Sequence, residues 1–131
     1  MRTKSCLTLA ETSKILAAAK AEAVKNSWTV TIAVVDDSGI LLHLERLDGA
    51  TAQSPDIAIL KARAAALGRT PSKALEDMVK DRPALAVFPN RAPVQGGLPI
   101  FYQGECVGGV GVSGVKSNED EQVAAAGVAA L

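Results

Sequence analysis

The chain has 131 residues, a length typical of one domain, and we expect a single domain over residues 1–131. Its 14 Lys and Arg residues balance 14 Asp and Glu residues, and only 3% of the chain is aromatic. This composition lacks the basic field and stacking surfaces of a nucleic-acid-binding protein, so we expect no nucleic-acid partner. The segment before Glu11 has only about five weakly apolar residues, too short a stretch for a signal-peptide core, and no run approaches the roughly 18 apolar residues of a membrane span. We expect a cytoplasmic protein with no membrane partner.

The N-terminal part of the chain predicts a helix followed by a β-hairpin. Thr8 and Glu11 form a capping-box pattern, and apolar residues recur at helical spacing as far as about Asn26. Residues 28–35 and 40–47 are rich in β-branched and apolar residues and are separated by four residues of turn chemistry. Such a short connection predicts an antiparallel pair of strands.

The middle of the chain predicts two helices and an irregular segment. Ser54 is expected as the N-cap of a helix from Pro55 to about Leu67, since proline suits the first helical position. A shorter helix is expected over residues 71–79. Prolines and glycines then prevent a long regular element, although residues 85–88 are expected to pair briefly as a strand.

The C-terminal part predicts a second hairpin and a final helix. Residues 98–102 and 105–113 flank a tight turn in which Gly104 supplies a positive φ. Ser117, with Asp120 three residues later, is expected to cap the last helix. The whole order of elements predicts a mixed α/β (α+β) domain, a profilin-like three-layer α/β/α arrangement with a five-stranded antiparallel sheet.

Glycines on the last predicted strand leave one face almost bare. The segment from Gly109 to Gly114 fits the dinucleotide pattern G-x-G-x-x-G, but no βαβ unit surrounds it, so we do not interpret it as a nucleotide site. Gly109, Gly111 and Ser113 instead alternate with valines. Either the final helix or a neighbouring subunit packs on this strip, or a flat ligand lies there. Gly96 and Gly97 are interpreted either as turn residues or as backbone donors to an anionic ligand.

Four residues around the predicted second helix form a candidate anion site. Arg46 and Asp48 end the second strand, Ser54 begins the helix, and Lys61 follows about two turns later. An Arg fork, a helix start and a Lys together would bind a carboxylate or propionate. The alternative is structural, because capping, turn formation and ion pairing explain each residue separately.

The titratable residues exclude several kinds of catalytic centre. His43 is the only histidine, so neither a multi-histidine metal cage nor a metal-centred hydrolase is expected, and no metal site is predicted. His43 is expected to face solvent, between two leucines that alternate with it. Cys6 and Cys106 lie far apart in sequence, and we expect two reduced thiols.

Several motifs in a fixed order suggest a family. They are TIAVVDDSG at 31–39, RLDGA at 46–50, SPDIA at 54–58 and GGLPIFYQGECVGGVGVSG at 96–114. With them the chain closely resembles the GlcG/HbpS-like family, which includes the C-terminal domain of PduO-type corrinoid adenosyltransferases. The resemblance implies the same fold and makes haem a possible cofactor. Haem-binding members tend to use a histidine in the first helix, where this chain has Glu11 and Glu22 instead.

Three functions remain open at this stage. The first is an accessory protein that binds a small ligand, haem or another tetrapyrrole, in cobalamin-dependent diol, glycerol or glycolate metabolism. The second is an enzyme for a small hydroxy acid or carbonyl compound, with Lys61 or Asp48 as base and Arg46 as carboxylate clamp. The third is a non-catalytic assembly subunit. We expect a homo-oligomer, a dimer or a multiple of dimers, because the many small apolar residues leave weakly polar surface to cover.

Overall fold

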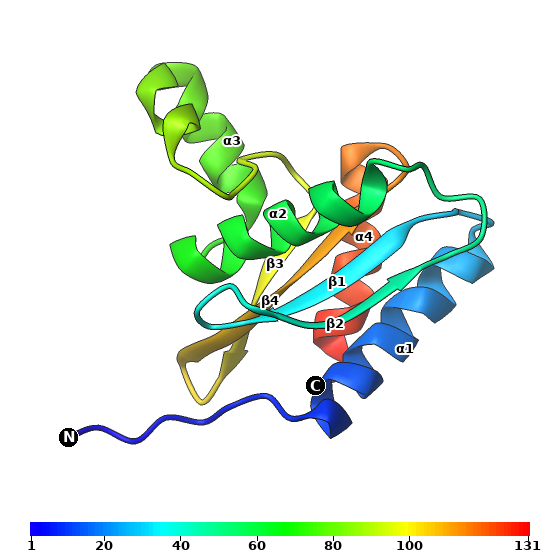
Figure 1. The fold of residues 1–131 in the computed structure, drawn as a ribbon, viewed down its shortest axis with the longest axis horizontal. Helices are drawn as coiled ribbons and strands as arrows, with labels where there is room; N and C mark the ends of the chain where they lie inside the picture. Colours follow the sequence, from blue (N-terminus) through cyan, green and yellow to red (C-terminus); the bar gives the residue numbers. More distant parts are fainter.

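The computed structural model describes residues 1–131, and its elements are drawn in Figure 1. In chain order they are α1 (Leu9–Lys25), β1 (Thr31–Asp36), β2 (Leu41–Arg46), α2 (Ser54–Gly68), α3 (Ser72–Asp81), the 3-10 helix η1 (Pro83–Val87), β3 (Gly97–Tyr102), β4 (Glu105–Ser113) and α4 (Ser117–Ala129). No helix is both long enough and apolar enough to cross a membrane.

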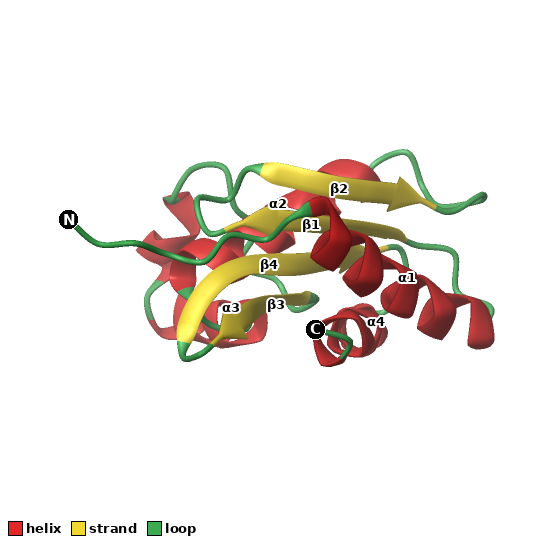
Figure 2. Ribbon diagram, turned by 90° about the horizontal axis from the view of Figure 1, so that it is seen from below, coloured by secondary structure: helices red, strands yellow, loops and turns green.

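The four strands form one antiparallel sheet in the order β2-β1-β4-β3. Helices α1 and α4 lie together on one face of this sheet, and α2 lies on the other, with α3 and η1 beyond it (Figures 1 and 2). Both predicted hairpins are confirmed. In the first turn the Asp36 carboxylate accepts hydrogen bonds from the amides of Ser38 and Ile40, each at 2.9 Å.

The expected fifth strand is wrong. Residues 83–87, which include most of the segment predicted to pair, form the 3-10 helix η1 with no buried residue. Pro83 suits the start of a helix, and the segment lies beside α3, away from both edges of the sheet (Figure 1). A brief run of apolar residues therefore did not indicate a strand here, because no strand edge is within reach.

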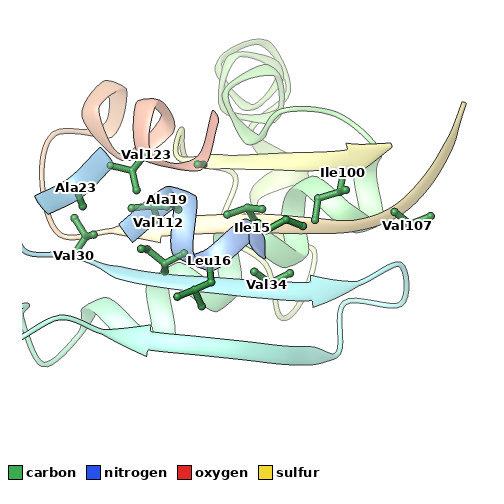
Figure 3. Packing of buried hydrophobic residues seen from close by; sticks show 13 residues of the cluster. Ile15, Leu16, Ala19, Ala23, Val30, Val34, Ile100, Val107, Val112 and Val123 are labelled. Carbon is green, nitrogen blue, oxygen red and sulfur yellow. The ribbon is translucent and has the colours of Figure 1, made fainter. Parts of the chain in front are cut away.

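The main core fills the space between the sheet and the α1–α4 layer. The apolar stripe predicted on the first helix, Ile15, Leu16, Ala19 and Ala23, is buried there against valines of β1 and β4 (Figure 3). Helix α4 packs directly on α1: a Cβ atom added at Gly127 would lie 3.0 Å from the Ile15 carbonyl oxygen. This close approach explains a glycine inside a helix, where it otherwise costs stability.

His43 was expected to face solvent, but the structure places it differently. It pairs with the core residue Val34 and is half-buried on the α1 side of β2, while its neighbour Leu42 is 39% exposed. Leu42 is more exposed than His43 because β2 is an edge strand that is covered better on its α1 side. Helix α2 lies mainly over β4 and β1, so the other side of β2 is incompletely covered and its leucines remain partly exposed.

Candidate functional site

The bare glycine strip of β4 is occupied by α2. A Cβ atom at Gly109 would lie 2.6 Å from the Ala62 carbonyl oxygen, and one at Gly111 would clash with the Ala58 carbonyl oxygen. An alanine-rich helix and a glycine strand therefore meet backbone to backbone. The packing interpretation holds, but the helix is α2 and not the final helix, which lies on the opposite face. No space remains on the strip for a flat ligand.

Lys61 lies in a buried ion pair rather than at an open site. Its Nζ atom is 2.9 Å from Oδ2 of Asp120 and 3.2 Å from the carbonyl oxygen of Val112. The two charged side chains are only 4% and 2% exposed. Lys61 thus connects α2 with α4, the helices of opposite layers, where the sheet ends. We call Lys61, Asp120, Gly96, Gly97 and Ser72 the Lys61 centre.

Asp120 was expected to assist the cap of α4 and instead belongs to this centre. The capping box of α4 uses Glu119, and the other oxygen of Asp120 accepts from the amide of Val115 at 3.2 Å. Burial raises the pKa of Asp120 above its ordinary value, although the hydrogen bond and charge of Lys61 oppose the shift.

Gly96 and Gly97 are needed because Lys61 passes so close to them. A Cβ atom at Gly96 would lie 2.8 Å from the Lys61 amine, and one at Gly97 would clash with the Lys61 carbonyl oxygen. The amide of Gly97 donates to the hydroxyl of Ser72 at 2.8 Å, and that hydroxyl donates to the Val94 carbonyl at 2.6 Å. The Gly97 amide is therefore already bonded within the protein and is not offered to an anion.

Arg46 and Ser54 have local structural partners. Nε and Nη2 of Arg46 donate to the Ala50 carbonyl at 3.2 and 2.8 Å, which closes the loop that leads into α2. Helix α2 begins at Ser54 itself, with Gln53 as N-cap, so the expected capping role is wrong. The Ser54 hydroxyl lies 2.8 Å from that of Thr31 and donates to the Thr51 carbonyl at 2.7 Å.

The predicted anion site is not assembled. Arg46 and Lys61 donate to different parts of the protein and share no partner. Asp48 is exposed and forms no ion pair, while Ser113 is buried opposite Thr31 in the sheet register. The structure brings Lys61, Gly96 and Gly97 together, but in the buried Lys61 centre, which no described cavity reaches.

An open groove of about 660 Å³ lies where the N-terminal segment, the β3–β4 hairpin and the end of α4 meet. We call it the hairpin groove. Figure 2 shows the N-terminal segment crossing this end of the sheet, and Arg2 pairs with Glu105 of the hairpin at 3.6 Å. Seven of the ten lining residues are hydrophobic, but polar and apolar atoms share the wall about equally. The lining residues are Ser5, Cys6, Leu7, Glu11, Phe101, Tyr102, Gln103, Val107, Val128 and Leu131.

Two of the residues that line the hairpin groove, Phe101 and Tyr102, are aromatic. Phe101 and Tyr102 are 49% and 47% exposed and come just before a tight turn in which Gln103 and Gly104 both have positive φ. Exposed aromatic side chains in a groove favour a flat, largely apolar ligand. The sequence pattern around Phe101 and Tyr102 predicts a strand and no ligand site. The available signal was that two of only four aromatic residues stand side by side at a hairpin tip.

The polar groups of the groove are few. Cys6 provides a free thiol, Tyr102 a phenol and Glu11 a carboxylate. Hydrogen bonds from the Thr8 hydroxyl and amide lower the pKa of Glu11, which therefore stays ionised as part of the α1 capping box. His43 does not line the groove, and no group of three or more His, Cys, Asp or Glu residues is arranged to hold a metal ion.

Comparison with known proteins identifies close relatives. Residues 7–129 match the family model described as "Haem degrading protein HbpS-like". The "Protein GlcG" of Escherichia coli is 44% identical over 114 residues, which is 86% of this chain and 85% of GlcG.

Two solved structures share the fold closely. The crystal structure of HbpS superposes with a TM-score of 0.96 at 36% identity, covering 100% of this chain and 94% of HbpS. The "PduOC:Heme Complex" superposes with a TM-score of 0.87 at 25% identity, covering 97% and 96%.

Proposed function

Because the chain belongs to the HbpS-like family, we propose that it binds a small ligand, a tetrapyrrole and haem in particular, in the hairpin groove. The observation that carries this proposal is the open groove, which is lined mainly by hydrophobic residues and includes the half-exposed Phe101 and Tyr102. The similarity to the PduOC–haem complex supports the choice of ligand.

The energetics of the groove suit a macrocycle better than a polar metabolite. Burying 200 Å² of apolar ligand surface would contribute about 5 kcal/mol before the cost of association. The groove itself offers no cationic side chain, although Lys4 lies nearby and is paired with Asp37 at 2.7 Å. We infer that contact with the rings, rather than charge, supplies most of the affinity.

The residues present fit a haem held without histidine. Within the groove only the Tyr102 phenol, the Cys6 thiol and the Glu11 carboxylate are candidates to ligate iron, and tyrosine and cysteine are known haem ligands in proteins. Bound haem would supply redox-active iron, while the chain itself would bind the ring, orient it and shield one face from water.

The proposed cellular role is supported by the family resemblance alone. We propose that the protein is a cytoplasmic accessory protein of cobalamin-dependent diol, glycerol or glycolate metabolism and that it forms a homo-oligomer. An enzyme using Arg46 and Lys61 is less well supported, because both side chains are engaged in hydrogen bonds within the protein. A role in assembly has one specific observation in its favour: Val87 and Phe88 are 78% and 53% exposed.

The proposal is tested by titrating the protein with hemin and following the Soret band. Replacing Phe101 by Ser should weaken binding by about tenfold, because an aromatic wall of the groove is lost. Phe88→Ser is the matched control, since Phe88 is similarly exposed but lies outside the groove. Equal affinity in both variants and the parent, or loss only in Phe88→Ser, would contradict the hairpin groove as the site. Cobalamin titrated in parallel distinguishes haem from a corrinoid.

A further inference from the structure

A second cavity, separate from the hairpin groove, lies between the end of α2, α3 and the segment after η1. Its volume is about 170 Å³, and its wall is formed mainly by carbon atoms of residues such as Leu75, Leu85 and Phe88, with Arg91 beside them. Figure 1 shows α3 and η1 on the outer side of α2, away from the sheet. The two cavities have no lining residue in common.

Arg91 is the one charged residue in this wall. Its guanidinium carbon lies 5.6 Å from the centre of the Phe88 ring, and no carboxylate pairs with it. The Nε atom of Arg91 is buried and has no hydrogen-bond acceptor. A buried donor without an acceptor costs about 1 to 3 kcal/mol, more when it is charged, so the protein alone does not satisfy the Arg91 guanidinium fully.

The backbone on both sides of Arg91 is fixed to α2. Nε of Arg63 donates to the Asn90 carbonyl at 2.6 Å, and the Ala92 amide donates to the Leu60 carbonyl at 3.1 Å. Arg63 also donates to Gly39 at 2.6 Å, which joins this loop to the first hairpin. Arg91 therefore starts from an anchored loop, which reduces the ordering cost of binding a ligand.

We propose that this cavity binds a small monocarboxylate with an apolar body, its carboxylate on Arg91 and its body against Phe88 and the leucines. The volume is close to that of an engineered cavity of about 150 Å³ that accepts benzene, which limits the body to about that size. A single unpaired guanidinium matches one carboxylate, and the carbon lining excludes a sugar or a nucleotide. This inference concerns a different site from the proposed haem groove and does not depend on it.

The test uses benzoate and isovalerate as probes, with benzamide as the neutral analogue of benzoate. We expect calorimetry to show benzoate binding to the full chain, benzamide binding at least about tenfold more weakly, and Arg91→Gln reducing benzoate affinity by a similar factor. Arg82→Gln is the matched control, because Arg82 is exposed and does not line the cavity. Hemin binding should be unchanged in Arg91→Gln, which separates this proposal from the haem proposal.

A second variant keeps the test decisive if Arg91→Gln folds poorly. Leu85→Trp should fill the cavity and abolish benzoate binding while leaving Arg91 in place. Equal affinity for benzamide and benzoate, unaltered binding in both variants, or no binding at about 10 mM benzoate would each overturn the proposal. So would an Arg91→Gln protein of lower oligomeric state that binds no benzoate, since the cavity would then belong to an interface between copies.

Discussion

The Lys61 centre and the hairpin groove are both built partly from the segment 96–114, yet they differ in almost every physical property. In the Lys61 centre the charged atoms of Lys61 and Asp120 are removed from water and matched by protein partners. In the hairpin groove Phe101 and Tyr102 are about half exposed to solvent. Charged residues such as Lys61 and Asp120 often indicate a ligand-binding site, but in this protein they stabilise the fold.

The difference shows where this chain can accept a ligand. A buried Lys bonded to protein partners stabilises one arrangement of α2, α4 and the sheet, and none of the four described cavities reaches it. Covering the exposed apolar side chains of the groove with a ligand lowers the free energy, because apolar surface is removed from water. We therefore propose the groove as the ligand site, whereas the Lys61 centre joins the two helical layers.

The strongest test of this assignment is Lys61→Met. Removing the amine leaves Asp120 buried without its counter-charge, and we expect the free energy of unfolding to fall by about 3 to 5 kcal/mol. Urea denaturation measures the loss. Lys73→Met, which breaks only the solvent-accessible pairs with Glu76 and Asp77, should cost less than about 1 kcal/mol. If Lys61→Met is stable but loses its ligand, the Lys61 centre is a binding site after all.

The same variant has an expected dependence on pH. The pKa of Asp120 is already raised by burial, and removing Lys61 removes the interactions that oppose the rise. An acid whose folded-state pKa is raised favours folding at pH values below its unfolded-state pKa and loses that contribution as pH rises through the folded-state pKa. The stability gap between parent and Lys61→Met should therefore be smaller near pH 4 than at pH 7, and a gap independent of pH would argue against a buried charge.

The sequence predicted most elements because their local signals agree with their packing. The capping box at Thr8, the apolar stripe of α1 and the two turns each depend on residues close together in sequence. The fifth strand failed for the opposite reason. Whether residues 85–88 pair depends on a free strand edge nearby, and that is a property of the whole fold.

The site was harder to predict for a related reason. Lys61 and Asp120 are far apart in sequence, so neither residue alone indicated that their charges neutralise each other. In the sequence alone Asp120 is not recognisable as its partner, so Lys61 was a candidate catalytic base. The groove combines the N-terminus, a hairpin and the C-terminus, and only the pair Phe101 and Tyr102 hinted at it locally.

A substitution in the glycine strip of β4 should have an intermediate effect on the free energy of unfolding. Gly111→Ala would push a methyl group into the backbone of α2, and we expect a loss of about 2 to 3 kcal/mol in the free energy of unfolding. Gly104→Ala is the comparison, because nothing lies within 4 Å and only its positive φ of 80° is strained. That change should cost about 1 kcal/mol. A fully stable Gly111→Ala protein would mean that α2 does not pack on the strip and that a ligand has room there.

The smallest expected effect concerns His43 and haem. His43 is half-buried against the α1 side of β2 and does not line the hairpin groove, so haem bound there cannot use it as an axial ligand. Ring contacts carry most of the affinity, and His43→Ala should change the hemin dissociation constant by less than about threefold with the Soret band unaltered. The parent spectrum should be that of a weakly coordinated or five-coordinate iron. A sharp six-coordinate spectrum that disappears only in His43→Ala would move the haem site from the hairpin groove to β2.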